Sequence, residues 1–232
     1  MQHLNSTYGQ EAFDPGLRAH MSKTYGLIAG GLAVSAATAW TIGFTSLRSL
    51  VVSAEGGLTV LGHIGLWAPL LLLLCAAVFR TGGVAAAKGV YWSFVALQGI
   101  GLSLVVMTVP PAAIVQAIAI TAFTFGAMSL YGYTTHRNLS GWGNFLLMGL
   151  FGIIIAAIVN IFLGSAALDF AVSVIGVLVF AGFTAYDTQN LRNMYYAGLD
   201  RDDLDYARYW SAIGLYLNIV NLFTFWLSFG RD

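Results

Sequence analysis

The chain has 232 residues, of which 58% are hydrophobic and only 9% are charged, and its mean hydropathy is +0.78. Soluble domains carry roughly 25% charged residues, so this chain cannot cover a globule of its size with polar surface, and we expect an integral membrane protein. The net charge is zero and no basic cluster is present, which argues against nucleic acid as a partner. The single cysteine, Cys75, excludes an internal disulfide and a cysteine-based metal cage.

The first 24 residues are polar and lack the apolar centre of a signal peptide. They contain Asp14, Arg18 and Lys23, and they predict a soluble, mobile tail over residues 1–24. The remaining residues, 25–232, consist of apolar runs joined by short loops, so we expect them to form one transmembrane domain.

Seven runs after the tail approach the ~20 apolar residues that are needed to cross the hydrocarbon core of a bilayer. They lie at 25–44, 58–79, 89–109, 112–133, 145–163, 170–189 and 211–229. Pro110 and Pro111 separate the third run from the fourth and predict a tight hairpin, because proline cannot continue a helix. His63 and Pro69 interrupt the second run, which is the least regular. We therefore predict an all-α membrane protein, a bundle of seven transmembrane helices.

Basic residues predict how this bundle is threaded through the membrane. With seven spans, eight of the ten basic residues fall on the side of the N-terminus, and only Arg48 and Arg231 fall on the other side. Positive charge is retained on the cytoplasmic side. We therefore expect a multi-pass membrane protein whose N-terminus is cytoplasmic and whose C-terminus is outside.

Asp187 is the most informative residue, because it is a carboxylate in the last turns of the sixth apolar run. A carboxylate at the centre of a membrane helix costs ~2.5–3.5 kcal/mol on insertion scales, so a retained one is a candidate for function. The alternative is that Asp187 lies close enough to the interface to stay hydrated as a helix-end carboxylate.

Two other polar residues are expected at a similar depth in the cytoplasmic half of the bundle. Asn218 lies about seven residues into the last span, or ~10 Å deep at 1.5 Å per residue, and Arg80 closes the second span. Asp187 would accept a hydrogen bond from Asn218 and pair with Arg80, forming a gate that responds to pH. The alternative, which is the more frequent role of such a residue, is that Arg80 is an ordinary interfacial cation.

Asn221 and Asn160 are further polar positions that an ion path through the bundle would use. The alternative for these two residues, and for Asn218, is that their amides simply bind helices to one another, a use worth ~0.6 kcal/mol on average. The acidic cluster at Asp200, Asp202, Asp203 and Asp205 is interpreted as a solvated loop, with weak binding of a cation as the alternative.

Enzyme signatures are weak. Tyr186-Asp187 is similar to the first motif of intramembrane aspartyl proteases, but those need a second intramembrane aspartate, and Asp169 belongs to the opposite membrane face. The chain contains no Gly-x-Ser-x-Gly or His-Glu-x-x-His motif. We expect neither catalysis nor a cofactor.

Four motifs together resemble the Bax inhibitor-1 (TMBIM) family, and more closely its bacterial YccA-like branch. They are YGYTTHRNLSG at 131–141, VNIF at 159–162, AYDTQ at 185–189 and LYLNIVNLF at 215–223. The resemblance covers essentially the whole chain after the tail, with the motifs in order.

The resemblance implies a seven-helix bundle in which the last helix is central, and a pH-sensitive leak of calcium across the membrane. It also implies that some bacterial members bind and restrain a membrane-anchored FtsH-type protease. In the leak members, two aspartates on the last two long helices share a hydrogen bond, and an arginine at the end of the second helix pairs with them. Asp187 matches the first aspartate and Arg80 matches the arginine, but Asn218 stands where the second aspartate is expected.

An aspartate–asparagine pair has one titrating group, whereas two carboxylates titrate as a coupled unit. Calcium prefers several hard oxygen ligands, often carboxylates. Asp187 is therefore only a weak candidate Ca²⁺ ligand, and Ca²⁺ is expected as a permeant ion. The first hypothesis is a calcium leak gated near Asp187. The alternative is a regulatory partner of a membrane-anchored protease that acts through the polar tail.

Overall fold

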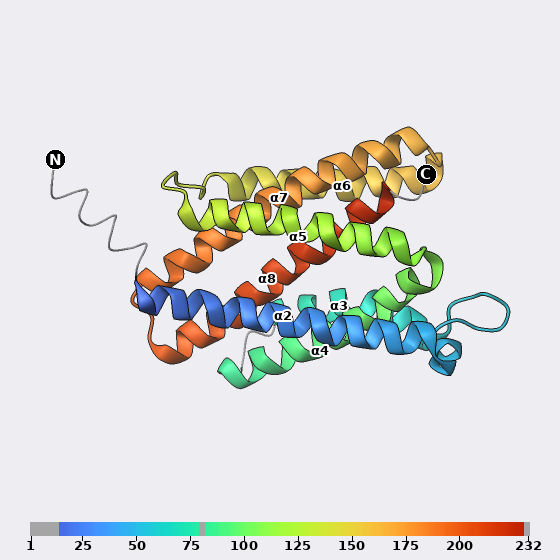
Figure 1. Ribbon diagram of the computed structural model, residues 1–232, viewed down its shortest axis with the longest axis horizontal. Coiled ribbons are helices and arrows are strands. Elements are labelled where there is room, and N and C mark those ends of the chain that lie inside the picture. The colour runs from blue at the N-terminus through green and yellow to red at the C-terminus, as the bar shows by residue number, and fades with distance from the viewer. Residues whose placement is uncertain (1–13, 79–81, 230–232) are drawn as a thin grey trace. The chain divides into compact units, whose positions relative to one another are not determined.

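The computed structural model describes residues 14–78 and 82–229. Apart from one isolated β-bridge between Val52 and Leu58, all regular structure in these two ranges is helical (Figure 1). The elements are α2 (Pro15–Phe44), the 3-10 helix η1 (Ser46–Leu50), α3 (Val60–Val78), α4 (Gly83–Thr108), α5 (Pro111–Thr134), α6 (Trp142–Leu163), α7 (Ala166–Tyr196) and α8 (Arg201–Ser228). The all-helical prediction is confirmed for this part of the chain.

Six of these helices are long and apolar enough to cross a membrane, namely α2, α4, α5, α6, α7 and α8. The apolar stretch of α3, Val60–Ala76, is shorter. Helix α3 begins two residues later than predicted because Thr59 precedes it as a cap, with its Oγ1 accepting a hydrogen bond from the N–H of Gly62 at 3.2 Å. The predicted end of this run, Phe79, lies outside the described residues.

Helix α2 begins ten residues earlier than the span predicted from the sequence. Asp14 Oδ1 accepts hydrogen bonds from the N–H groups of Gly16 at 2.8 Å and Leu17 at 3.2 Å. Pro15 occupies the first helical position, where its missing N–H has no helical partner to lose. This combination of cap and proline fixes the start of the helix.

One face of the first turns of α2 is buried against other helices of the protein. Four side chains spaced as on a single helix face are buried: Leu17, His20, Met21 and Thr24. Residues 15–24 therefore belong to a packed helix and not to the mobile tail that was expected, while residues 1–13 lie outside the described part. This helical start was not predicted from the sequence because polar residues separate the buried positions.

The chain divides into two compact units, which are described separately. The first contains Met1–Tyr25, Gln116–Leu199 and Leu217–Asp232, and the second contains Gly26–Val115 and Asp200–Tyr216. Helices α2 and α8 each contribute residues to both units.

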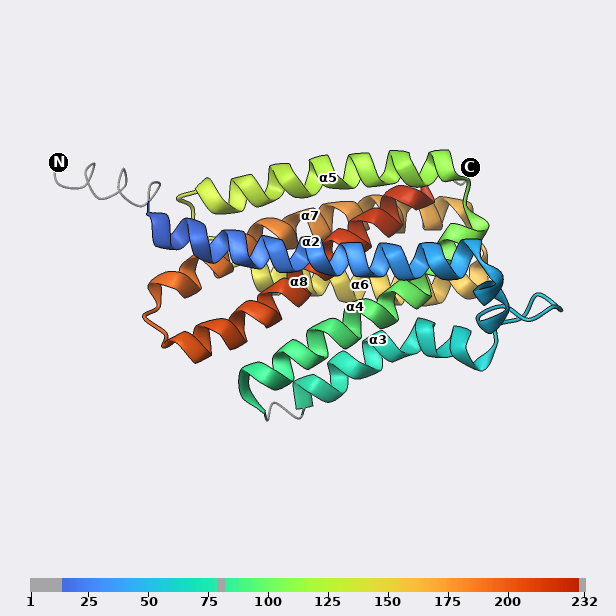
Figure 2. The ribbon, with the colours of Figure 1, turned by 60° about the horizontal axis from the view of Figure 1, so that its bottom comes forward.

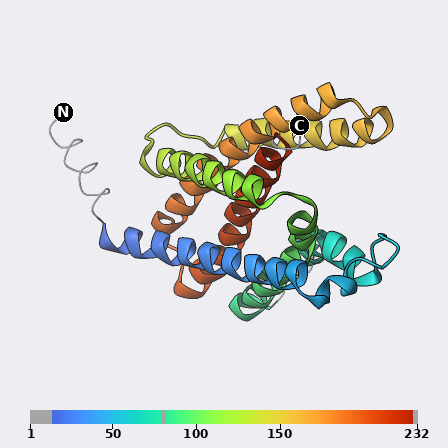
Figure 3. The same ribbon diagram turned by 45° about the vertical axis from the view of Figure 1, so that its right-hand side comes forward.

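In the first unit, α6 and α7 form a hairpin and lie side by side (Figures 1 and 3). The turn between them depends on Gly164, which has a left-handed backbone at φ 59° and donates its N–H to the carbonyl of Asn160 at 2.8 Å. Ser165 then caps α7, because its Oγ accepts from the N–H of Leu168 at 3.3 Å.

Helix α7 also packs antiparallel to the last part of α8. The hydroxyls of Ser173 and Ser228 are hydrogen-bonded to each other at 2.6 Å, and Phe180 packs against the fully buried Leu222. Between these contacts, Gly176 lies so close to Phe225 that an added Cβ would fall 2.6 Å from the ring. This glycine permits the close approach of the two helices, and the pairing sets their register.

In the second unit, α3 and α4 form a hairpin (Figure 2), with Gly65 of α3 packed directly on Ile100 of α4. Buried hydroxyls tie this unit together. Ser35 Oγ donates to the carbonyl of Val95 at 2.6 Å and contacts the Tyr216 hydroxyl, also at 2.6 Å.

The predicted break at the double proline is confirmed. Helix α4 ends at Thr108 and α5 begins at Pro111, with Val109 in an extended conformation between them.

Candidate functional site

A carboxylate and an amide meet between α7 and α8 in the first unit. The Asn218 side chain donates its Nδ2–H to Asp187 Oδ2 at 2.7 Å. Asn218 is buried, with 4% of its surface exposed, whereas Asp187 is partly exposed. A hydrogen bond from a neutral amide to an ionised carboxylate is charge-assisted, so this contact is stronger than an ordinary amide pair.

The antiparallel packing of α7 and α8 brings these two residues together. Counting from the Ser173–Ser228 contact, the chain advances 14 residues along α7 to Asp187 and returns 10 residues along α8 to Asn218. The Phe180–Leu222 packing lies between the two polar contacts. The Asp187–Asn218 pair therefore lies at one end of the apolar interface between α7 and α8.

A chain of hydroxyl contacts lies beside the pair and joins three helices. Thr188, the residue after Asp187, donates from its Oγ1 to Ser129 Oγ of α5 at 3.2 Å. The same Ser129 hydroxyl makes a short hydrogen bond with the hydroxyl of Tyr25 in α2. Because Thr188 is next to Asp187 in sequence, these contacts join α2, α5 and α7 close to the level of the pair.

Gln189 holds the connection between α5 and α6 against α7. Its Nε2–H donates to the carbonyl of Arg137 at 2.8 Å, and its Oε1 accepts from the N–H of Leu139 at 2.8 Å. One turn further along α7, Arg192 donates to the carbonyls of Tyr133 at 2.7 Å and Thr135 at 3.3 Å. A cation placed on these carbonyls stabilises the C-terminus of α5.

Gln189 lies in a motif for which no structural role was predicted from the sequence, and no contact of Arg192 was predicted either. Arg137 and Leu139 lie in the 131–141 motif, and Gln189 lies in the 185–189 motif. The structure thus connects two motifs that are about 50 residues apart. The only signal in the sequence was the amide side chain of Gln189 within its motif. Its partners could not be predicted, because they are backbone atoms and every residue has the same backbone atoms.

The first turns of α2 add a further contact that was not foreseen. His20 Nε2 lies 3.1 Å from the carbonyl oxygen of Leu191, and its ring lies 5.8 Å from that of Tyr195. Both partners belong to the last turns of α7. The start of α2 therefore covers the end of α7 that carries Gln189 and Arg192.

The remaining predicted site residues are not part of the pair. Arg80 lies outside the described residues, so its pairing with Asp187 stays a prediction. Asn221 donates to the carbonyl of Leu217 in its own helix at 2.8 Å. Asn160 caps the α6–α7 turn, accepting from the N–H of Ser165 at 3.0 Å, roughly 30 Å along α7 from Asp187. Asn160 therefore serves the turn and does not join the pair.

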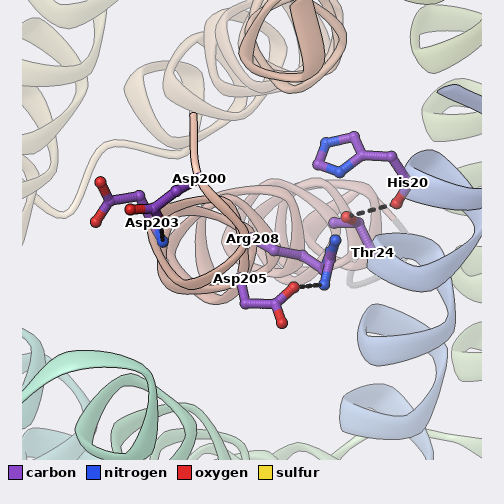
Figure 4. Close-up of polar contacts among 6 residues, drawn as sticks. All are labelled: His20, Thr24, Asp200, Asp203, Asp205 and Arg208. Carbon is purple, nitrogen blue, oxygen red and sulfur yellow. Dashed lines mark hydrogen bonds and ion pairs between the residues drawn. The ribbon is translucent and has the colours of Figure 1, made fainter. Parts of the chain in front are cut away.

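The acidic cluster forms the start of α8 and not a loop (Figure 4). Asp200 Oδ1 accepts from the N–H of Asp203 at 2.8 Å, and Asp205 forms an ion pair with Arg208. Carboxylates in the first turn stabilise a helix through its dipole. Helix α8 consequently starts at Arg201, ten residues before the predicted span. Figure 4 also shows the Thr24 hydroxyl donating to the carbonyl of His20 within α2.

Within the described residues, no group of three or more histidine, cysteine, aspartate or glutamate side chains is arranged to hold a metal ion. Calcium takes six to eight oxygen ligands. Asp187 with Asn218 offers one carboxylate, which is fewer oxygen ligands than a stable calcium site needs.

Comparisons with known proteins identify the family. The model of a family described as "Inhibitor of apoptosis-promoting Bax1" matches residues 17–229. The chain belongs to the Bax inhibitor-1 family. The match includes the helices that carry Asp187 and Asn218 as well as both loop motifs.

Bacterial relatives of this Bax inhibitor-1 family protein are similar over most of their length. The inner membrane protein YbhL of Escherichia coli strain K12 is 40% identical over 212 residues, which cover 90% of this chain and 89% of YbhL. An uncharacterised protein of Caulobacter vibrioides is 42% identical over 223 residues, covering 93% and 89% of the two chains. An uncharacterised membrane protein of Streptococcus pyogenes serotype M3 is 30% identical over 222 residues, covering 94% and 95%. The predicted family membership and membrane location are thereby supported.

Proposed function

We propose that this Bax inhibitor-1 family protein mediates a slow, pH-sensitive leak of cations, including Ca²⁺, across the bacterial inner membrane. The observation that carries the proposal is the hydrogen bond between Asp187 and Asn218 at 2.7 Å. Placing an ionisable group in a membrane helix is expensive. A purely structural contact between α7 and α8 would be made more cheaply by apolar side chains, as it is at Phe180 and Leu222.

In this proposal, the charge of Asp187 controls the gate. The ionised carboxylate holds Asn218 and pairs with Arg80 at the end of the second span, which keeps that span against α7 and closes the cytoplasmic mouth. Protonation of Asp187 removes the attraction for the arginine. Acidification therefore loosens the contact and increases the leak.

The proposal includes the arrangement of the chain in the membrane. Helix α3 supplies a seventh span, so the N-terminus is cytoplasmic and the C-terminus is outside. This orientation is supported by the eight of ten basic residues that then lie on the cytoplasmic side. We propose that α8 is central, because 44% of an 18-residue apolar window of this helix is buried, against 39% or less for the corresponding windows of the other five long helices.

The test compares this proposal with the alternative, a regulator of a membrane-anchored FtsH-type protease. Purified protein is reconstituted in liposomes that contain a calcium dye, alongside a variant without residues 1–13 (which leaves α2 whole) and Asp187→Asn. A leak predicts calcium entry that survives the deletion and changes with Asp187→Asn. Calcium entry no faster than in empty liposomes, with protease activity that depends on residues 1–13, would contradict the leak and favour the regulator.

A further inference from the structure

A groove runs between the first turns of α2 and the second half of α5, within the first unit. Helix α2 lines it with Arg18, Met21 and Tyr25, and α5 lines it with Gly126, Ser129 and Tyr133 among others. These residues recur at intervals of three to four along each helix, so each set occupies one face. The groove therefore follows both helices lengthwise.

The floor of the groove is closed and its rim is open. Met21 and Ser129 are buried, and the Tyr25 hydroxyl bonds to Ser129 across the floor. Gly126 is exposed, and a Cβ added to it would meet no atom within 4 Å. The missing side chain at Gly126 leaves a slot that a chain of methylene groups would fit.

The open end of the groove carries a positive charge. Arg18 is exposed and lies seven residues, or ~10 Å, before Tyr25 on α2. The segment from Tyr25 to Phe44 is about as long as the ~30 Å hydrocarbon core, which places Arg18 at the level of the lipid headgroups. The nearest carboxylate on this helix, Asp14, already accepts hydrogen bonds from the N–H groups of Gly16 and Leu17.

We propose that this groove binds one anionic phospholipid, with an acyl chain along Tyr25 and Gly126 and its phosphate at Arg18. The guanidinium group can bind two phosphate oxygens at once, which favours a phosphate over other anions. In a bilayer, an apolar groove beside a headgroup-level cation is filled by the lipid whose two parts match it. This inference is independent of the proposed leak.

The experiment counts lipids on the intact protein. Full-length protein in a non-ionic detergent is mixed with equal amounts of phosphatidylglycerol and phosphatidylcholine, and the bound lipids are measured by native mass spectrometry. The wild type is expected to retain one phosphatidylglycerol in preference to phosphatidylcholine. Arg18→Gln should bind phosphatidylglycerol about tenfold more weakly, because a charge-assisted hydrogen bond is lost.

Two matched controls separate the groove from the rest of the surface. Lys23→Gln removes an exposed cation from the same helix outside the groove lining, and it should bind phosphatidylglycerol like the wild type. Gly126→Leu should fill the slot and lose the lipid. Gly152→Leu should keep it, because Gly152 is an equally open glycine on α6.

The proposal is overturned if phosphatidylcholine is retained as well as phosphatidylglycerol, or if Arg18→Gln binds phosphatidylglycerol no more weakly than Lys23→Gln does. It is also overturned if Gly126→Leu retains as much lipid as Gly152→Leu. Each variant is first checked for a single elution peak and a wild-type unfolding temperature. If Gly126→Leu fails this check, the Arg18 and Lys23 pair decides the question alone.

Discussion

Asp187 is hydrogen-bonded to a neutral partner, and this determines how the pair responds to protons. The Asn218 amide donates to the carboxylate but neither gains nor loses a proton itself. The pair therefore changes its charge in a single step, whereas two carboxylates at the same distance would titrate as one coupled unit. A cation that passes this pair meets at most one negative charge.

The first prediction concerns position 218, where a substitution can restore the second carboxylate that the family resemblance led us to expect. Asn218→Asp should move the midpoint of the pH response of calcium flux toward neutral pH by about one unit or more, because two nearby carboxylates share a proton. It should also increase the preference for Ca²⁺ over K⁺, since a second anionic oxygen faces the ion. Flux measured in liposomes across a pH series, with each ion in turn, provides the test. An unchanged midpoint and selectivity would mean that position 218 does not face the ion path.

The second prediction concerns Gln189, which binds the backbone of Arg137 and Leu139 at once. Gln189→Leu removes both hydrogen bonds and should destabilise the protein by roughly 1–3 kcal/mol. Hydrogen exchange at the Leu139 amide should accelerate, because its acceptor is lost. Gln116→Leu, at an exposed glutamine of α5, is the control and should leave this amide protected. Equal protection of the Leu139 amide in both variants would contradict this role of Gln189.

At the scale of elements, close packing between α5 and α7 holds the scaffold around the pair. Gly132 of α5 faces the backbone of α7, and a Cβ added there would lie 2.2 Å from the carbonyl oxygen of Ala185. Backbone atoms cannot move aside as the end of a flexible side chain can. The interface between α5 and α7 therefore requires glycine at position 132.

The third prediction uses two glycines of the same helix. Gly132→Ala should destabilise the protein by about 1–3 kcal/mol through overpacking, and it should disturb the Thr188–Ser129 contact one turn away. Gly126→Ala meets no atom within 4 Å and should be neutral or stabilising by up to about 1 kcal/mol, since alanine favours helix. Thermal unfolding in detergent measures both. If the two variants unfold at the same temperature, the close α5–α7 approach is wrong.

Element boundaries show what the sequence can and cannot predict. The break at Pro110 and Pro111 follows from proline chemistry alone, and it was predicted correctly. The starts of α2 and α8 were each predicted ten residues too late, because hydropathy detects only the part of a helix that lies in hydrocarbon. Asp14 and Asp200 extend these helices beyond that part by capping their first turns.

The Asp187–Asn218 contact was foreseen because antiparallel spans allow depth to be counted from the loop between them. The contacts of Gln189, Arg192 and His20 were not foreseen. Their acceptors are backbone carbonyls of distant segments, and every residue type offers the same carbonyl. Spacing and composition therefore carry no information about them.

At the scale of the whole molecule, the number of crossings decides which side of the membrane each terminus occupies. Six helices have the length and composition of membrane spans, and α3 is shorter. A tag at the N-terminus and a tag in the α5–α6 connection should both report as cytoplasmic, and a tag after Asp232 should report as external. Accessibility to a membrane-impermeant thiol reagent in intact cells measures this. A cytoplasmic C-terminus would contradict seven spans and favour six.

The central claim is that the charge of Asp187 gates a cation leak, and calcium flux into dye-filled liposomes as a function of pH tests it most directly. Wild-type protein is compared with Asp187→Asn and with Asp169→Asn, which removes the other carboxylate of α7, in its first turn. We predict that wild type and Asp169→Asn leak faster at acidic pH. Asp187→Asn, which mimics the protonated form, should leak at the faster rate at every pH. If Asp187→Asn keeps the wild-type pH response, or if no protein leaks faster than empty liposomes, Asp187 has only a structural role in α7 and the account is wrong.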